Sequence, residues 1–196
     1  MKNKATILAA ALTAAVLGGA AESRGGGWSG DANILLAGKH LDNGDWGPTD
    51  SQGEIGLVTN WRGPSWPVAL AADFLASSHD ADISRDGFTE QRGKTSELDL
   101  GARKIWRPDA RMRPYAGGGL ALASGELTRT GPAGTISDSD SGAGLWLDGG
   151  VFWTLSEAFN LGFDVRISAA NVRLLGADRN AGGFHLGLLA GYHWGG

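Results

Sequence analysis

The feature that most constrains this chain is a two-residue alternation between apolar and other side chains. In residues 161–169 every second position is apolar, with small or charged residues between: Leu161, Phe163, Val165 and Ile167 against Gly162, Asp164, Arg166 and Ser168. Successive side chains of a β-strand point to opposite sides. The segment is therefore predicted to be a strand with one apolar face and one face of small and charged residues.

The same alternation recurs along the chain between turn signals, and it gives eight predicted strands. They are residues 32–41, 54–61, 68–77, 96–106, 114–127, 143–153, 160–172 and 183–194. None of these segments shows a 3.6-residue period, so no substantial helix is predicted after the N-terminal segment. The sequence predicts an all-β chain.

The connections between these strands alternate in length. Those after the first, third, fifth and seventh strands are longer and polar, and those after the second, fourth and sixth are short. In an up-and-down meander, neighbouring strands are antiparallel, so the long connections are expected at one end and the short turns at the other. This layout is typical of outer-membrane barrels, which have short periplasmic turns and longer external loops.

The N-terminus has the layout of a secretory signal peptide. Lys2 and Lys4 precede an apolar run at residues 7–17, which is too short for a membrane-spanning helix, and small residues follow up to Ala20 and Ala21. The predicted organisation is a signal peptide at residues 1–21 and a barrel domain at residues 22–196. Cleavage removes two of the 17 basic residues and leaves 21 acidic ones, which argues against nucleic-acid binding. The absence of cysteine excludes disulfides and thiolate chemistry.

The composition of the non-apolar face indicates which side of the strands meets water. A solvated face is usually rich in Lys, Glu, Thr and Gln, whereas here Gly, Ala and Ser stand beside isolated charges. Such a face suits a narrow closed lumen in which buried charges pair with one another. The predicted acids are Asp73, Glu97, Asp99, Asp148 and Asp164, and the predicted cations are Lys39, Arg103 and Arg166. The apolar face is then expected to meet lipid; a soluble periplasmic ligand-binding barrel, with the faces inverted, is the alternative.

Aromatic residues gather at the predicted short-turn end of the strands, as they do at membrane interfaces. These residues are Trp61, Trp66, Trp106, Trp153, Tyr192 and Trp194. Strands of about ten residues span the hydrocarbon when tilted. Eight strands enclose an interior that side chains fill, which argues against a general porin.

The chain resembles the small eight-stranded outer-membrane barrels of the OmpA-domain and OmpX type, most clearly at residues 113–123 and 182–194. The resemblance implies an eight-stranded antiparallel up-and-down transmembrane β-barrel in the outer membrane of a Gram-negative bacterium. It also implies a monomer in contact with outer-membrane lipid and lipopolysaccharide. In that family the barrel-assembly machinery reads an aromatic residue at the end of the last strand. Tyr192 and Trp194 fit this signal, although Gly195 and Gly196 follow them.

Some barrels that resemble this one in size modify lipid A, and each type has its own pattern of residues around a catalytic histidine. The deacylases carry a His, a Ser two residues later and a Glu; His185 and His193 lack that Ser. A palmitoyl-transfer site would need His, Asp and Ser near the external rim. Two sets have these residue types, His40 with Asp42 and Ser51, and His79 with Ser77 and Asp80. Nothing in their spacing requires a site, and no catalytic residue is predicted.

Metal and cofactor sites are not predicted either. Asp138 and Asp140 suit a hard cation by residue type, but solubilising charge is the preferred interpretation. Residues 117–119 form a glycine run without the Lys-Ser/Thr of a phosphate loop, and glycines within a strand permit close packing. The predicted function is therefore an outer-membrane barrel with a structural or interaction role, no open pore and no catalysis. The alternatives are a lipid A-modifying enzyme, a narrow channel for protons or small ions, and the soluble barrel described above.

Overall fold

The computed structural model describes residues 27–156 and 158–195, so the predicted signal peptide at residues 1–21 lies outside the described residues. Strands make up most of the described chain. The elements are β1 (Ser29–His40), α2 (Asn43–Trp46), the 3₁₀ helix η2 (Gly47–Thr49), β2 (Ser51–Arg62), β3 (Ala69–Arg85), β4 (Phe88–Ile105), β5 (Met112–Gly131), β6 (Gly134–Thr154), β7 (Phe159–Leu174), β8 (Ala177–Asn180) and β9 (Gly183–Trp194). Within the described residues, no helix has the length and apolar character needed to cross a membrane.

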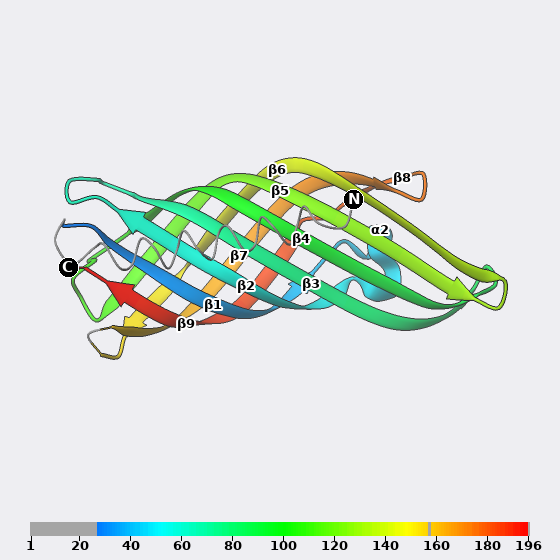
Figure 1. Cartoon of the computed structure of the whole chain (residues 1–196), viewed down its shortest axis with the longest axis horizontal. Coiled ribbons are helices and arrows are strands. Elements are labelled where there is room, and N and C mark those ends of the chain that lie inside the picture. The colour runs from blue at the N-terminus through cyan, green and yellow to red at the C-terminus, as the bar shows by residue number, and fades with distance from the viewer. Residues whose placement is uncertain (1–26, 157, 196) are drawn as a thin grey trace.

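Eight of the strands close into an antiparallel barrel (Figure 1). Each strand from β1 to β7 pairs with the next, β7 also pairs with β9, and β9 pairs with β1. β8 pairs only with β7 and lies outside the ring. The predicted eight-stranded up-and-down barrel is confirmed. Closure leaves no open strand edge within the ring, as a membrane-spanning sheet requires.

The short turns lie at the same end of the barrel as the start of β1 and the end of β9, as predicted. Gly30 near the start of β1 pairs with Trp61 near the end of β2 and with Trp194 at the end of β9. The connections at residues 63–68 and 106–111 share this end, as do the end of β6 and the start of β7. Figure 1 shows the C-terminus beside these turns.

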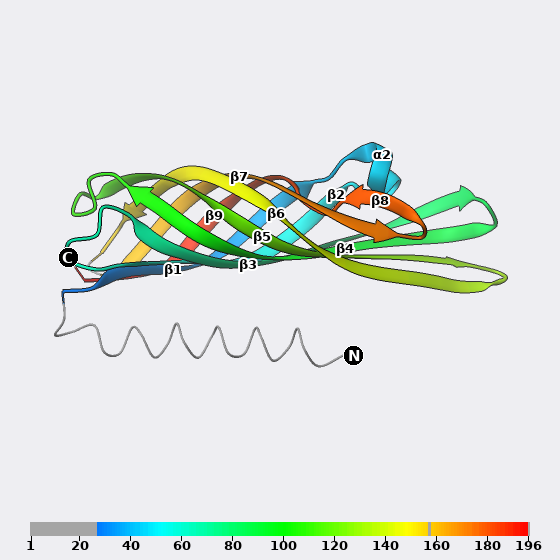
Figure 2. The ribbon, with the colours of Figure 1, turned by 90° about the horizontal axis from the view of Figure 1, so that it is seen from above.

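Two of the predicted long loops are instead continuations of the strands. β3 and β4 stay paired as far as Arg85 and Phe88, and β5 and β6 as far as Gly131 and Gly134. Asp86 and Gly87 join the first pair with φ angles of 55° and 78°. Asp-Gly suits the type I′ turn because both of its central residues need a positive φ. Residues 79–95 and 124–141 therefore form a four-stranded projection beyond the barrel, which we call the external blade (Figure 2).

The other two long connections fold over the mouth of the barrel and form what we call the lid, residues 41–50 and 175–182. Trp46 of α2 is almost fully buried, and its Nε1 donates a 2.7 Å hydrogen bond to the carbonyl oxygen of Asn180 at the end of β8. Its indole packs in an apolar cluster under the lid: Leu41, Ala123, Leu127, Ala170, Val172, Leu174 and Ala181. The external end is therefore covered by residues from both connections.

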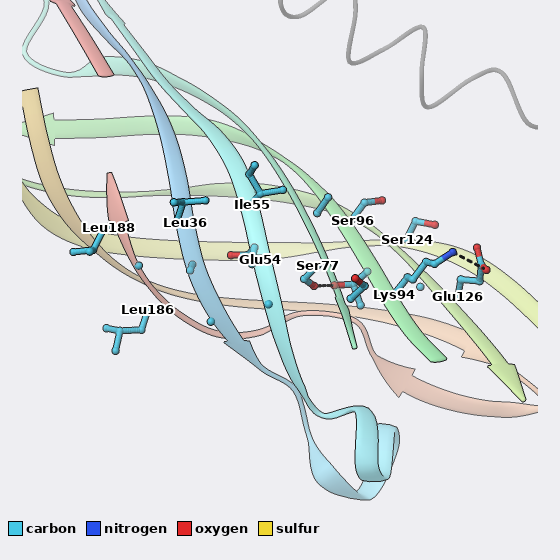
Figure 3. A pocket seen from close by; sticks show the side chains of 18 of the residues that line it. Leu36, Glu54, Ile55, Ser77, Lys94, Ser96, Ser124, Glu126, Leu186 and Leu188 are labelled. Atoms are coloured by element: carbon cyan, nitrogen blue, oxygen red, sulfur yellow. Dashed lines mark hydrogen bonds and ion pairs between the residues drawn. The ribbon is translucent and has the colours of Figure 1, made fainter. Parts of the chain in front are cut away.

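The outer wall carries an apolar belt. Leu36, Ile55, Leu186 and Leu188 project from β1, β2 and β9 along one broad surface (Figure 3), and Leu188 is 66% exposed. On β5 the belt runs from residue 112 to residue 122. Eleven residues at ~3.3 Å each and a tilt of ~45° rise about 25 Å, the height of the apolar band of outer-membrane barrels. This agrees with the predicted lipid-facing assignment.

The belt ends at a polar boundary on the external side. Figure 3 shows Ser96 and Ser124 on the same outer surface, with Lys94 of β4 and Glu126 of β5 forming an ion pair. Their nitrogen and oxygen atoms are 3.5 Å apart, and both side chains are exposed. The outer face therefore changes from leucine to serine and charged residues where the blade begins.

The aromatic girdle at the short-turn end is confirmed with one correction, and Trp61 at this end is only partly exposed. Its exposed members are Trp28, Trp66, Trp106, Trp153, Phe159 and Tyr192. Trp194 was expected in this girdle, but it is only 6% exposed, because its indole covers Gly30. A Cβ at Gly30 would lie 2.3 Å from that ring, so the glycine makes room for it.

Candidate functional site

The centre of the lumen is a network of buried ion pairs. Arg103 Nη2 lies 2.7 Å from Asp73 and 2.5 Å from Asp148, and Arg166 reaches Asp73 at 2.6 Å and Asp99 at 2.5 Å. These side chains have no exposed area. The predicted pairing of inward acids with Arg103 and Arg166 is confirmed, and it answers the need of a buried charge for a hydrogen-bonded partner.

Trp146 of β6 forms a wall of this network that the sequence did not single out. The guanidinium carbons of Arg103 and Arg166 lie 5.5 Å and 5.0 Å from its ring, within cation–π range.

The glycine run at residues 117–119 leaves room for the side chains of this network. A Cβ at Gly117 would lie only 2.7 Å from Asp148 Oδ1. The predicted role of residues 117–119 in close packing is confirmed.

A second cluster near the short-turn end was missed. Arg113 donates to both carboxylate oxygens of Asp31, at 2.7 Å and 3.2 Å, and Asn160 and His193 also contact that carboxylate. Arg113 and Asp31 stand one residue outside the predicted strands. Extending the alternation by one position would have placed both side chains inside the lumen.

Lys39 ties the barrel wall to the lid. Its ammonium pairs with Glu97, one of the predicted lumen acids, and donates hydrogen bonds to Thr95 Oγ1 and to the carbonyl oxygen of Ala181, both at 2.8 Å. Because Ala181 belongs to the lid, a lumen cation holds the cover in place. A single ammonium thus satisfies groups from β4 and from the connection before β9.

His185 has the partners of a serine–histidine–acid relay, although the spacing rule excluded it. Its Nδ1 lies 2.9 Å from Glu54 Oε1, and its Nε2 lies 3.1 Å from Ser168 Oγ. The serine comes from the neighbouring strand β7 rather than from two residues along β9. Inward parity placed all three residues on the lumen face, but only the register between β2, β7 and β9 brings them together.

The surroundings of this relay are closed. Ser168, His185 and Glu54 are each more than nine-tenths buried. The backbone N–H of Gly183 donates to Ser168 Oγ at 3.3 Å, and Glu97 Oε1 lies 3.7 Å from His185 Nε2. As packed, the three side chains hold β2, β7 and β9 together.

The set His40, Asp42 and Ser51 is only partly assembled. His40 Nδ1 and Ser51 Oγ are 3.1 Å apart on the exposed rim. Asp42 instead precedes α2, where its backbone carbonyl accepts the N–H of Trp46 at 3.0 Å. The acid beside this pair is Asp50, whose pKa is lowered by a hydrogen bond from the Asn43 side chain and further by Ser51 and His40.

The set His79, Ser77 and Asp80 is divided between two faces. Ser77 points into the lumen, where its hydroxyl lies 2.7 Å from both Gln52 Oε1 and Thr95 Oγ1. Asp80 lies on the outer face and pairs with Arg92, whose hydrogen bond lowers the pKa of the Asp80 carboxyl. His79 is exposed on the blade. The three residue types are therefore not brought to one site.

Asp138 and Asp140 each accept a backbone N–H group. Asp138 Oδ2 accepts the N–H of Leu175, and Asp140 Oδ2 accepts the N–H of Arg173, both at 2.7 Å. The bond from Arg173 is the main cause that lowers the pKa of Asp140. In the part of the chain that the structure describes, no three or more His, Cys, Asp or Glu residues are grouped to hold a metal ion.

Comparisons with known proteins agree with this architecture. Residues 6–193 match the family described as outer membrane protein beta-barrel domain. Neisserial surface protein A is 14% identical with a TM-score of 0.57, over 87% of this chain and 97% of that one. OprG of Pseudomonas aeruginosa is 13% identical with a TM-score of 0.57, over 87% and 97%. Ail, the attachment invasion locus protein of Yersinia pestis, is 13% identical with a TM-score of 0.55, over 85% and 98%.

At these identities the structural likeness concerns the fold alone, and no curated protein matches the chain significantly. The family match covers nearly the whole sequence, and it agrees with the closed ring, the apolar belt and the girdle. The chain therefore belongs to the outer membrane protein beta-barrel domain family, as a small eight-stranded barrel of the outer membrane.

Proposed function

We propose that this barrel is a closed scaffold of the outer membrane that neither conducts nor catalyses. Its external blade and lid are the parts that meet lipopolysaccharide or extracellular ligands. The observation that carries the proposal is the filled lumen. Arg103, Arg113, Arg166 and Lys39 are all buried and ion-paired inside it, and Trp46 closes the mouth above them.

The packing supports a barrier rather than a channel. An eight-stranded barrel has an interior only wide enough for side chains. Moving an ion through it would require breaking salt bridges in a place with little water, where each separated charge is costly. The narrow-channel alternative therefore requires the central network to rearrange.

Planar-bilayer recording tests the closed lumen. The refolded wild-type chain is expected to give no discrete conductance steps at either polarity, whereas a porin recorded in the same bilayers gives them. Folding is checked by the mobility shift between boiled and unboiled samples on a detergent gel. Reproducible steps from folded wild-type protein would overturn the proposal.

Trp46→Ala is the matched variant for the lid. If the lid alone closed the barrel, this variant would conduct; we expect silence, because the charge network below it remains intact. The barrier would then be assigned to the lumen. Steps in Trp46→Ala with a silent wild type would move the barrier to the lid and leave the closed state of the wild-type barrel intact.

The Ser168–His185–Glu54 relay favours one second candidate, a lipid-modifying hydrolase. We assign the relay a packing role because its serine is buried. A fluorophosphonate probe is expected to leave Ser168 of the folded wild type unlabelled. Labelling that is lost in Ser168→Ala, together with altered lipid A in cells that express the wild type, would favour the enzyme.

Two further parts of the proposal concern assembly. We propose that the barrel is a monomer and that the assembly machinery reads its last strand at Tyr192, which is exposed on the outer wall. Tyr192→Ala is expected to slow appearance of the heat-modifiable form in cells, while purified Tyr192→Ala refolds like wild type. Equal rates in cells would remove Tyr192 from this role, and a dimer in light scattering would remove the monomer.

A further inference from the structure

A cleft of about 490 Å³ lies at the external mouth, between the inner face of the blade and the lid. Its walls come from α2 and η2, the tip of β3, and single residues of β4, β5 and β8. The side chains that matter here are Trp46, Ile83, Arg85, Gln91, Arg129 and Arg179. None of the lumen ion pairs described above belongs to it.

Arg129 enters this cleft from β5. It shares the inward parity of the fully buried Leu127, so it faces away from the lipid-facing leucines of the same strand. Its Nε donates a 3.0 Å hydrogen bond to Gln91 Oε1, and Gln91 is held in turn by the carbonyl oxygen of Trp46 at 2.9 Å. The guanidinium is thereby oriented, and among the described residues no carboxylate lies within ion-pair distance of it.

Arg179 enters from the lid, on β8. Its Nε is buried and has no hydrogen-bond partner among the described residues. Burial lowers the pKa of Arg179, and the nearby charge of Arg129 lowers it further, while Asp45 acts in the opposite direction. Two cations thus lie close enough to disfavour each other, and one has a donor that nothing in the described chain accepts.

The carboxylates at this cleft, Asp45 and Asp86, already have other partners. Asp45 Oδ2 accepts the backbone N–H of Asn180 at 2.8 Å, which fixes the lid. Asp86 lies at the exposed tip of the blade beside Arg85, at 3.5 Å. Arg129 and Arg179 therefore line this cleft without a carboxylate partner among the described residues.

We propose that Arg129 and Arg179 bind the phosphate or sulfate group of a saccharide ester in this cleft. A guanidinium presents a planar fork of N–H donors that matches the oxygens of such a group. A doubly charged oxyanion between the two arginines would relieve their repulsion. Ile83 and Pro48 provide apolar edges for a sugar ring.

This site is independent of the closed scaffold proposed above. A barrel without conductance can bind such an ester or fail to bind it, and a conducting one could bind it equally well. Failure of the binding experiment therefore leaves the conductance result standing, and the reverse also holds.

The test uses the full refolded barrel in phospholipid nanodiscs without lipopolysaccharide. Glucose 6-phosphate and glucose 6-sulfate are titrated by calorimetry, with glucose and glucuronate as neutral and carboxylate controls. Saturable binding of at least one ester is expected. Arg129→Gln and Arg179→Gln should each weaken it at least tenfold. No saturable ester binding, or glucuronate binding as tight as the esters, would overturn the proposal.

Arg173→Gln is the matched control. Arg173 is exposed on β7, in the same hairpin as Arg179 of β8, and its substitution removes the same charge. It is expected to change the affinity by less than twofold. An equal loss in Arg173→Gln and Arg179→Gln would reduce the effect to general electrostatics and overturn the site. Folding of every variant is verified by the boiled and unboiled gel.

Two further readouts identify the contact and the source. In nuclear magnetic resonance spectra the side-chain signals of Arg129 and Arg179 are expected to shift when the ester binds; unchanged signals would remove these two groups from the site and overturn the proposal. Repeating the titration in nanodiscs that contain lipopolysaccharide identifies the natural source. Loss of ester binding would support a site filled by phosphates of that lipid, and unchanged binding would support a soluble saccharide.

Discussion

Arg166 in the lumen and Arg179 at the mouth show two different fates for a partly or fully buried arginine. Arg166 has no exposed side-chain area and reaches Asp73, Asp99 and Asp148. Arg179 is half-buried beside the charge of Arg129, and among the described residues no carboxylate lies within ion-pair distance of it. The difference indicates that the lumen neutralises its own charges, whereas the external cleft leaves donors for something that arrives from outside.

Depth within the barrel explains this contrast. Deep in the lumen, where little water enters, an unpaired charge would have to be desolvated without compensation, so the chain itself must supply the counter-charge. At the mouth, water or a ligand can provide it. Substitutions in the lumen, on the outer wall and at the mouth are therefore expected to differ widely in their cost.

Removing the charge of Arg166 should cause the largest loss in the free energy of unfolding. Arg166→Met leaves Asp73, Asp99 and Asp148 with fewer partners, and breaking a buried pair from one side costs about 3–5 kcal/mol. Urea unfolding in micelles, followed by tryptophan fluorescence, measures the loss. The exposed pair provides the control: Arg92→Met should unfold like wild type. Equal midpoints for Arg166→Met and wild type would show that the lumen network contributes nothing.

An arginine placed on the outer wall should destabilise the barrel, because it has no counter-charge there, unlike the arginines of the lumen. Leu188→Arg puts a cation on the lipid face, where nothing neutralises it, and about 2–4 kcal/mol of stability should be lost near the bilayer midplane. Reversible folding into lipid vesicles gives the value. Thr128→Arg on the polar outer face of the blade is the control and should be nearly neutral. Similar costs at both positions would contradict the membrane-facing assignment.

The two arginines of the cleft should behave oppositely to those of the lumen. Arg129→Gln and Arg179→Gln are expected to change the free energy of unfolding by no more than about 0.5 kcal/mol, as for surface substitutions. Relief of their mutual repulsion offsets the lost contacts. Arg103→Gln, measured by the same urea titration, should instead lose several times as much. A large loss at Arg179 would mean that it stabilises the lid and is not kept for a ligand.

The smallest effect concerns the tether between Asp140 and Arg173. The pKa of Asp140 is below its ordinary value of 3.8 because the ionised carboxylate accepts a backbone N–H. Its contribution is therefore present above about pH 4 and is lost as the pH falls through the lowered pKa. Protection of the Arg173 amide from hydrogen exchange should decrease at low pH. Asp140→Asn should remove that pH dependence and Asp178→Asn should keep it; a wild type without any pH dependence would refute the tether.

The two-residue period anticipated most of the barrel. It placed Glu97, Asp99 and Arg103 on one face of β4 and left Leu98 and Leu100 on the other, because side-chain direction along a strand depends only on position. It failed where pairing continued past the membrane. Residues 78–94 read as a polar loop, yet the Asp86–Gly87 turn lets β3 and β4 remain paired there.

The two-residue pattern could not predict side-chain contacts between strands that are far apart in the sequence. Glu54, Ser168 and His185 belong to three strands, and only closure of the ring with a particular register brings them within hydrogen-bond distance. Arg129 and Arg179 meet because β8 folds back over the mouth.

The sequence by itself therefore determined the number of barrel strands, the faces that meet lipid and lumen, and the end that carries the aromatic residues. These features follow from local periodicity and composition. The tertiary structure decided which acid pairs with which cation, how the lid closes, and which arginines lie without a carboxylate partner among the described residues. Those outcomes depend on register and loop folding, where small shifts along a strand decide whether two charges touch.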